Sequence, residues 1–188
     1  MIYPVKLDYD LEPFINADYS VHSGSCITHQ VNELKDVHES YGGFPDSYDI
    51  GNTMIRQLWW DNTQVDFDSI GEQLNMEVVT VSSILQPPGH IIPIHRDTFY
   101  QIKQRYPDDR RKKIRANIFL EDWKVGHLIQ YEKHDKTWDT STHWSAGDGF
   151  VWDSRPLHLS ANAGMNNKFT LQISGFYQKE VDLLDSLL

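Results

Sequence analysis

The chain has 188 residues, of which 17 are Lys or Arg and 27 are Asp or Glu, so its formal net charge is −10. This length suffices for one domain with a core of its own, and an acidic balance of this size opposes sequence-independent binding to nucleic acid at long range. The single cysteine, Cys26, excludes an intramolecular disulfide framework and a cysteine-rich zinc site.

The chain carries no signal for a membrane or for secretion. Its first residues lack a basic stretch followed by an apolar run, and nowhere do 18 apolar residues follow one another. We therefore expect a cytoplasmic, non-membrane protein. No repeat or long linker divides the sequence, so we expect one domain over residues 1–188.

Residues 1–75 are predicted to mix helices and strands that support a sheet. Apolar side chains recur at helical spacing between residues 31 and 41 and stop at Gly42, which favours a helix that ends there. A second short helix is predicted over residues 67–74, after the acidic Asp66. We expect both helices to brace the sheet rather than to carry chemistry.

From Met76 onward the hydrophobic period changes to two, and turn residues recur at short intervals. Such a run of short strands indicates a mainly β fold, a sandwich or jelly-roll barrel, with its core in residues 76–177. Residues 178–188 are expected to form a C-terminal helix. The predicted strands are residues 76–85, 91–97, 114–122, 127–132, 149–153, 157–162 and 168–176.

A candidate metal site lies in the strand IIPIHRD. His95 and Asp97 are two residues apart, so they project to the same side of the strand while Arg96 points away. His158, in the later strand LHLSAN, is the natural third ligand. Two imidazoles and one carboxylate with the other positions open suit non-haem Fe(II), although an H-x-D triplet also arises by chance.

The strand KFTLQISGF has one polar and one apolar face. Lys168, Thr170 and Gln172 share the polar face, which can bind a carboxylate several ångströms from the metal or can simply face solvent. In the strand IRANIFLED, Arg115 and Asn117 likewise share a face. They look either into the same cavity or outward from the sheet.

A basic segment separates the metal strand from IRANIFLED. Residues 103–115 hold 7 of the 17 basic side chains, with Phe99, Tyr100 and Tyr106 nearby. The segment is either a solvated loop or a lid that draws an anionic substrate, including nucleic acid, towards the metal.

Three stretches together carry a family resemblance: HRD, then RANIFLEDWKVGHLIQYE, then WSAGDGFVWDSRPLHLSANAGMNNKFTLQISGF. They resemble the Fe(II)- and 2-oxoglutarate-dependent oxygenases over roughly residues 78–177, in particular the prolyl 4-hydroxylase-like and the aspartyl/asparaginyl or proline hydroxylase-like members. The resemblance implies a double-stranded β-helix, which is a cupin-like jelly roll. It also implies an enzyme that uses Fe(II), 2-oxoglutarate and O2.

The resemblance further implies roles for individual residues. His95, Asp97 and His158 would hold the iron, and 2-oxoglutarate would chelate it. Lys168 would pair with the far carboxylate, to which Thr170 would donate a hydrogen bond. We place Arg115 and Asn117 beside the cofactor in the same cavity.

The expected reaction is hydroxylation of an unactivated C–H bond with release of succinate and CO2. The expected substrate is a small molecule or polypeptide that presents an amino-acid side chain, free or peptidyl, such as proline or an Asp- or Asn-like residue. Three alternatives stay open: oxidation of a nucleobase, with residues 103–115 contacting phosphate, a jelly-roll module that binds a ligand without turnover, and a zinc hydrolase.

Overall fold

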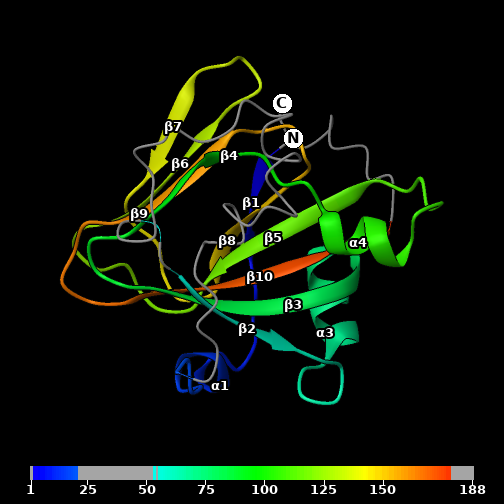
Figure 1. Ribbon diagram of the computed structural model, residues 1–188, viewed down its shortest axis with the longest axis horizontal. Coiled ribbons are helices and arrows are strands. Elements are labelled where there is room, and N and C mark those ends of the chain that lie inside the picture. The colour runs from blue at the N-terminus through cyan, green and yellow to red at the C-terminus, as the bar shows by residue number, and fades with distance from the viewer. Residues whose placement is uncertain (1, 21–52, 54, 179–188) are drawn as a thin grey trace.

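The computed structural model describes residues 2–20, 53 and 55–178. Three sequence-based features lie outside these residues: Cys26, the helix predicted between residues 31 and 41, and residues 179–188 of the predicted C-terminal helix. Within the described residues, two antiparallel sheets face each other and short helices lie around them (Figure 1).

The larger sheet has six strands in the order β1, β8, β5, β10, β3, β2. Their bounds are β1 Ile2–Lys6, β8 Asp148–Trp152, β5 Lys113–Phe119, β10 Lys168–Tyr177, β3 Met76–Gln86 and β2 Arg56–Trp60. The smaller sheet has four strands in the order β4, β9, β6, β7. Their bounds are β4 Ile91–His95, β9 His158–Asn162, β6 His127–Glu132 and β7 Trp138–Ser141.

This architecture confirms the predicted mainly β, jelly-roll fold. All seven strands predicted from the period-two pattern are present, with shifted ends at most of them. The sequence pattern did not single out β1, β2 or β7. Each has only four or five residues and is largely exposed or half-buried, so it lacks the alternation that marks the other strands.

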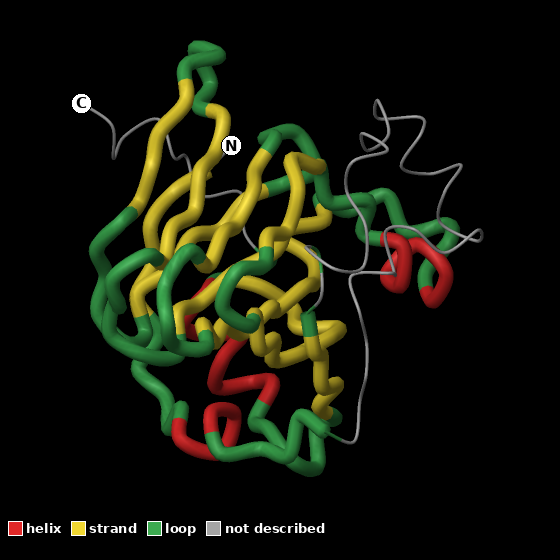
Figure 2. Tube along the Cα trace, turned by 60° about the vertical axis from the view of Figure 1, so that its left-hand side comes forward, coloured by secondary structure: helices red, strands yellow, loops and turns green. Residues whose placement is uncertain are grey.

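Three helices lie among the described residues: α1 Glu12–Ile15, α3 Phe67–Leu74 and α4 Tyr100–Arg105. The predicted helix after Asp66 is therefore confirmed. It begins where the Asp66 side chain accepts a hydrogen bond from the Ser69 amide at 2.9 Å, which is an N-cap contact. In Figure 2, α1 and α3 lie together on one side of the sheets, while α4 stands apart from them.

The main hydrophobic core lies on the face of the six-stranded sheet that α1 and α3 cover. Alternation along β5 sends Ile114, Ala116 and Ile118 into this core, where they pack with Leu171 and Ile173 of β10. The intervening residues of both strands therefore point to the opposite face, towards the four-stranded sheet. As a result, the space between the two sheets receives the polar side chains of β5 and β10.

Candidate metal centre

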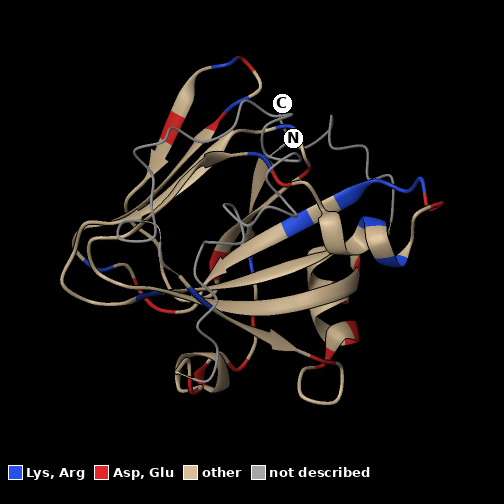
Figure 3. Cartoon of the chain, viewed as in Figure 1, with Lys and Arg blue, Asp and Glu red and all other residues tan. Residues whose placement is uncertain are grey.

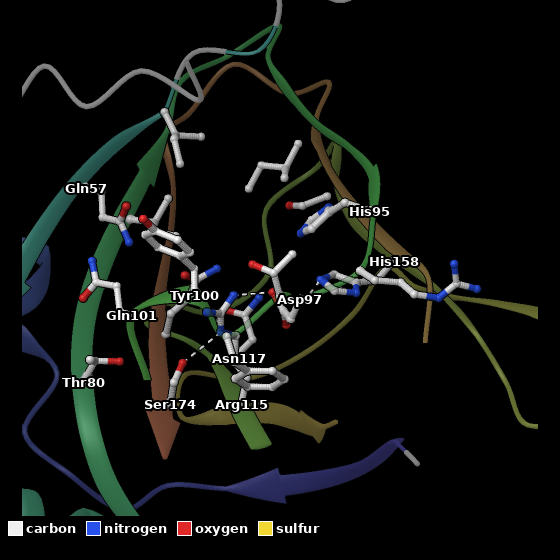
Figure 4. A pocket seen from close by; sticks show the side chains of 18 of the residues that line it. Gln57, Thr80, His95, Asp97, Tyr100, Gln101, Arg115, Asn117, His158 and Ser174 are labelled. Atoms are coloured by element: carbon white, nitrogen blue, oxygen red, sulfur yellow. Dashed lines mark hydrogen bonds and ion pairs between the residues drawn. The ribbon is translucent and has the colours of Figure 1, made fainter. Parts of the chain in front are cut away.

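His95, Asp97 and His158 come together between the two sheets. β4 and β9 are antiparallel neighbours in which His95 lies directly opposite His158, so the pairing of these strands brings the two rings to a centroid distance of 4.2 Å. Asp97 follows the end of β4, and its Oδ2 lies 3.8 Å from His158 Nε2. One potential ligand atom from each residue lies within 4.8 Å of the others. Figure 4 shows the three side chains at the cavity.

Both histidines are held in the tautomer that binds metals. His95 Nδ1 donates to the Pro93 carbonyl at 2.7 Å, and His158 Nδ1 donates to the Pro156 carbonyl at 3.2 Å. In this tautomer each Nε2 is unprotonated and carries the lone pair that binds a cation. Burial lowers the pKa of His95 to about 3 and also lowers that of His158, so both rings are neutral at pH 7.

The Asp97 carboxylate accepts hydrogen bonds from two side chains of the six-stranded sheet. Arg115 on β5 and Trp152 on β8 are directly paired across their strands. The Arg115 guanidinium donates to Asp97 Oδ1, and the Trp152 indole donates to Oδ2. Burial raises the pKa of Asp97, but Arg115, the two histidines and the Trp152 indole together outweigh burial and hold this pKa at about 2. The carboxylate is thus ionised and fixed in direction.

A cavity of about 180 Å³ adjoins the three residues. Its lining comes from both sheets and from α4. Phe99, which precedes α4, has the left-handed conformation with φ of 52° and turns the chain so that the helix borders the cavity. Besides the three metal-binding candidates, the polar part of the lining comprises Gln57, Thr80, Arg96, Thr98, Tyr100, Gln101, Arg115, Asn117, Ser160, Gln172 and Ser174.

Of the residues predicted beside the cofactor, Arg115 and Asn117 do line this cavity. Arg115 donates a hydrogen bond to the Asp97 carboxylate and another, through Nε, to Ser174 Oγ at 2.9 Å. Asn117 is 9% exposed, and its Oδ1 is buried with no hydrogen-bond partner among the described residues. A buried acceptor without a donor is uncommon in proteins and indicates a place where a ligand group fits.

Lys168 and Thr170 are both buried, but neither lines the cavity with the three metal-binding candidates. Lys168 Nζ donates to the Leu128 carbonyl at 2.7 Å and to Ser160 Oγ at 2.6 Å. Since Ser160 does line the cavity, one hydroxyl group links the lysine to it. Burial lowers the pKa of Lys168 to about 7, and among the described residues no carboxylate lies within ion-pair distance of its ammonium group.

The sequence analysis missed several residues of this site. Trp152 was recognised only as part of a strand, and the contact of Ser160 with Lys168 was not expected. Gln57 and Gln101 come from β2 and α4, two elements that were not predicted. The period-two pattern could have placed Ser160 on the face of His158, because the two residues are two apart in one strand.

The basic segment at residues 103–115 contains part of α4, the loop after it and the start of β5, and Figure 3 shows its charges along these elements. Several of these charges are already paired. Arg111 forms ion pairs with Glu77 at 2.5 Å and with Asp109 at 2.7 Å, and Lys112 lies 3.7 Å from Asp153. No helix among the described residues has the length and apolar character needed to cross a membrane.

No protein-family model matches the sequence, and no curated protein is similar to it. Several solved structures are similar to this chain in fold. One is a Pseudomonas putida prolyl-4-hydroxylase, 17% identical, with a TM-score of 0.53 over 95% of this chain and 92% of that chain. Another is SnoK, a non-heme alpha-ketoglutarate-dependent carbocyclase from nogalamycin biosynthesis, 12% identical, with a TM-score of 0.53 over 100% of this chain and 86% of that one.

A third similar structure is SnoN, a non-heme alpha-ketoglutarate-dependent epimerase from the same biosynthesis. It is 12% identical, with a TM-score of 0.54 over 98% of this chain and 81% of that chain. At these identities the similarity establishes the fold, which is the double-stranded β-helix implied by the sequence resemblance. Since these relatives are named for hydroxylation, ring closure and epimerisation, the fold does not by itself determine a reaction.

Proposed function

We propose that this protein is an Fe(II)- and 2-oxoglutarate-dependent dioxygenase that hydroxylates an unactivated C–H bond and releases succinate and CO2. The observation that carries this proposal is the buried group of His95, Asp97 and His158 beside a cavity. Two neutral imidazoles and one carboxylate are the ligand set of non-haem Fe(II) oxygenases. A zinc hydrolase is a weaker candidate: three such ligands would also suit catalytic zinc, but the fold is shared with alpha-ketoglutarate-dependent enzymes.

The surrounding residues also fit 2-oxoglutarate. This co-substrate carries two carboxylates, of which one would lie at the iron and the other several ångströms away. Lys168 is a buried cation, and the groups around its ammonium in the described part of the chain are a carbonyl, a hydroxyl and the face of Trp144 at 5.4 Å, all of them neutral. A carboxylate at this place would supply the missing counter-charge, and Asn117 would offer a polar contact along the way.

With iron and 2-oxoglutarate bound, O2 would be the oxidant: one oxygen atom would go to succinate as 2-oxoglutarate loses CO2, and the other would go to the C–H bond of the substrate. The protein would bind and orient the metal and the co-substrate. His95, Asp97 and His158 would hold the metal, while Arg115 and Trp152 keep the Asp97 carboxylate in one direction. Lys168 would fix the far end of the co-substrate, with Thr170 two residues along the same face of β10.

For the substrate, we infer an amino-acid side chain, free or peptidyl, such as proline or an Asp- or Asn-like residue. The sequence resemblance to hydroxylases of these residues and the fold shared with a prolyl-4-hydroxylase support this choice. Oxidation of a nucleobase is less well supported, because Arg111 and Lys112 in the basic segment already pair with carboxylates. We also keep the expectation of one cytoplasmic domain over residues 1–188.

The proposal is tested by anaerobic titration of Fe(II) and 2-oxoglutarate into the protein. We expect the weak visible charge-transfer band of the metal chelate, and succinate formation once O2 is admitted. His95→Ala should abolish both signals, whereas His134→Ala, which removes an exposed histidine, should leave both unchanged. Neither band nor succinate in the unmodified protein would instead favour a binding module without turnover.

A further inference from the structure

We propose that the substrate of this site is uncharged and presents amide groups, and that Thr80, Gln101 and Gln172 recognise it. This inference rests on the proposed function, since it concerns the molecule that would react at the iron. It chooses between the free and the amide-blocked forms of an amino acid. The argument uses the wall of the cavity that faces the two histidines.

That wall is made of neutral side chains from three elements. In Figure 4, Gln57, Thr80 and Gln101 lie on the side of the cavity opposite His95 and His158. Thr80 stands on β3, Gln57 on β2 and Gln101 on α4. The polar groups of a substrate held between this wall and the metal would form hydrogen bonds with the side chains of the wall.

The strand register continues this neutral surface across the floor of the cavity. Thr80 of β3 lies opposite Ser174 of β10, which in turn lies opposite Arg115 of β5. One pair further along, Gln172 of β10 lies opposite Asn117 of β5. The only charge in these two rows is that of Arg115, which is already paired with Asp97.

The other charges of the cavity are also occupied. Besides the three metal-binding candidates and Arg115, the charged side chain in its lining is Arg96. Arg96 donates through Nε to the Arg155 carbonyl at 2.8 Å and lies 3.8 Å from Glu132. A free amino acid brings an ammonium and a carboxylate group, and burying either without a counter-charge is strongly unfavourable. Besides Asp97, which pairs with Arg115, the described lining holds no carboxylate for the ammonium group, and its remaining cation, Arg96, already lies beside Glu132.

Several polar groups of the lining are, by contrast, without partners. Thr80 is only 7% exposed, yet its hydroxyl has no hydrogen bond to any described residue. The side-chain amides of Gln101, which is exposed, and of Gln172, which is half-buried, also have no hydrogen bond to a described residue. Each glutamine amide offers a donor and an acceptor, which is the complement of an amide in the substrate. A substrate that covers these groups removes them from water, so a molecule that forms hydrogen bonds with them is favoured over one that does not.

The apolar part of the cavity agrees with a substrate of this kind. Trp59 on β2 and Tyr100 on α4 line the cavity and are 48% and 38% exposed, so they stand where it meets solvent. Ile84 and Ile92 add aliphatic surface to the lining. A flat or aliphatic ring carrying amide groups would match both the apolar and the polar surfaces.

Four compounds that share one ring test the inference. These are N-acetyl-L-prolinamide, which is uncharged, N-acetyl-L-proline, which is an anion, L-prolinamide, which is a cation, and L-proline, which is a zwitterion. Binding to the protein loaded with Fe(II) and 2-oxoglutarate is measured anaerobically by calorimetry. We expect the uncharged compound to bind at least tenfold more tightly than the other three. Equal binding of the four, tighter binding of a charged compound, or no binding of the uncharged one would overturn the inference.

Two variants tie this preference to the named residues. Gln172→Glu adds a charge at nearly constant shape, and Thr80→Val removes the hydroxyl. Each should weaken binding of N-acetyl-L-prolinamide about fivefold to twentyfold, while Gln178→Glu, at an exposed position after β10, should leave it unchanged. Unaltered binding in both site variants would overturn the assignment. Throughout, the charge-transfer band reports on the proposed function separately: its absence would refute that function, whereas its presence with no preference for the neutral compound would refute only this inference.

Discussion

Two buried charged groups lie between the sheets, and they differ in how their charges are balanced. Asp97 is surrounded by partners: Arg115, the Trp152 indole and the two histidine rings. Lys168, at the start of β10, has a backbone carbonyl and the Ser160 hydroxyl as its hydrogen-bond partners. The first group is charge-balanced within the protein, while the second has a cation without an acid.

The difference indicates which ligand each group can bind. Around Asp97 the chain has fixed the direction of the ligands before any metal binds, so the metal meets an organised site. Around Lys168 the chain has buried a cation at a cost that the fold does not recover. A bound anion would recover it. The comparison therefore assigns metal binding to one group and co-substrate binding to the other, and the following changes should separate the two functions.

The largest effect is expected from Asp97→Asn. This change keeps the shape of the side chain but removes the anionic ligand and leaves Arg115 without its partner, so Fe(II) affinity should fall at least about 100-fold. Equilibrium dialysis under anaerobic conditions measures it. Asp139→Asn, at a side chain that is 50% exposed, is the matched control and should bind iron normally. Iron affinity within threefold of the unmodified protein would contradict the assignment.

Lys168→Ala should act on the other group alone. Losing one charge-assisted contact should weaken 2-oxoglutarate binding about 10- to 100-fold, while Fe(II) affinity stays within twofold. Titration of the charge-transfer band gives both quantities. Lys136→Ala is the control, because that lysine side chain is 73% exposed. Unchanged 2-oxoglutarate affinity in Lys168→Ala would show that another cation holds the far carboxylate.

Local sequence patterns sufficed for seven of the ten described strands and for the three residues that meet at the candidate metal centre. Period-two alternation placed Ile114 and Ile118 on one face of the strand and Arg115 and Asn117 on the other, because every second residue of a strand faces the same side of the sheet. The pairing of Arg115 with Asp97 could not be predicted in this way. It joins two different sheets, and nothing in the spacing of residues 97 and 115 specifies which face meets which.

The helix α4 was missed for a related reason. Its one buried side chain, Ile102, packs with Phe99, Val79 and Phe176, so its stability comes from the sheet below it rather than from its own pattern. The sequence therefore indicated a basic loop or lid where the structure has a short helix that borders the cavity. The neutral wall of the cavity depends on this helix and on β2, so the period-two pattern could not predict it either.

The two groups should also respond differently to pH. Burial lowers the pKa of Lys168 to about 7, so the free protein loses the ammonium charge as the pH rises above 7. Affinity for 2-oxoglutarate should then fall by up to about tenfold for each pH unit above 7, because only the charged lysine attracts the carboxylate. Iron affinity should change much less between pH 7 and 8, since Asp97 is already ionised and both histidines are already neutral. Co-substrate affinity that is flat or rises over this range would contradict the role of Lys168.

The smallest effect concerns the stability of the protein without iron and co-substrate. Because the pKa of Lys168 is lowered on folding, the unfolded chain binds more protons between about pH 7 and 10.5, and the contribution of this residue to stability rises with pH over that range. Lys168→Met replaces the cation with an apolar chain of similar length, so it should raise the melting temperature by about 2–6 °C at pH 6.5. The gain should shrink at pH 9, where the lysine is already neutral. Calorimetry checks it: a lower melting temperature at pH 6.5 would mean that the contacts to Leu128 and Ser160 outweigh the burial of the charge.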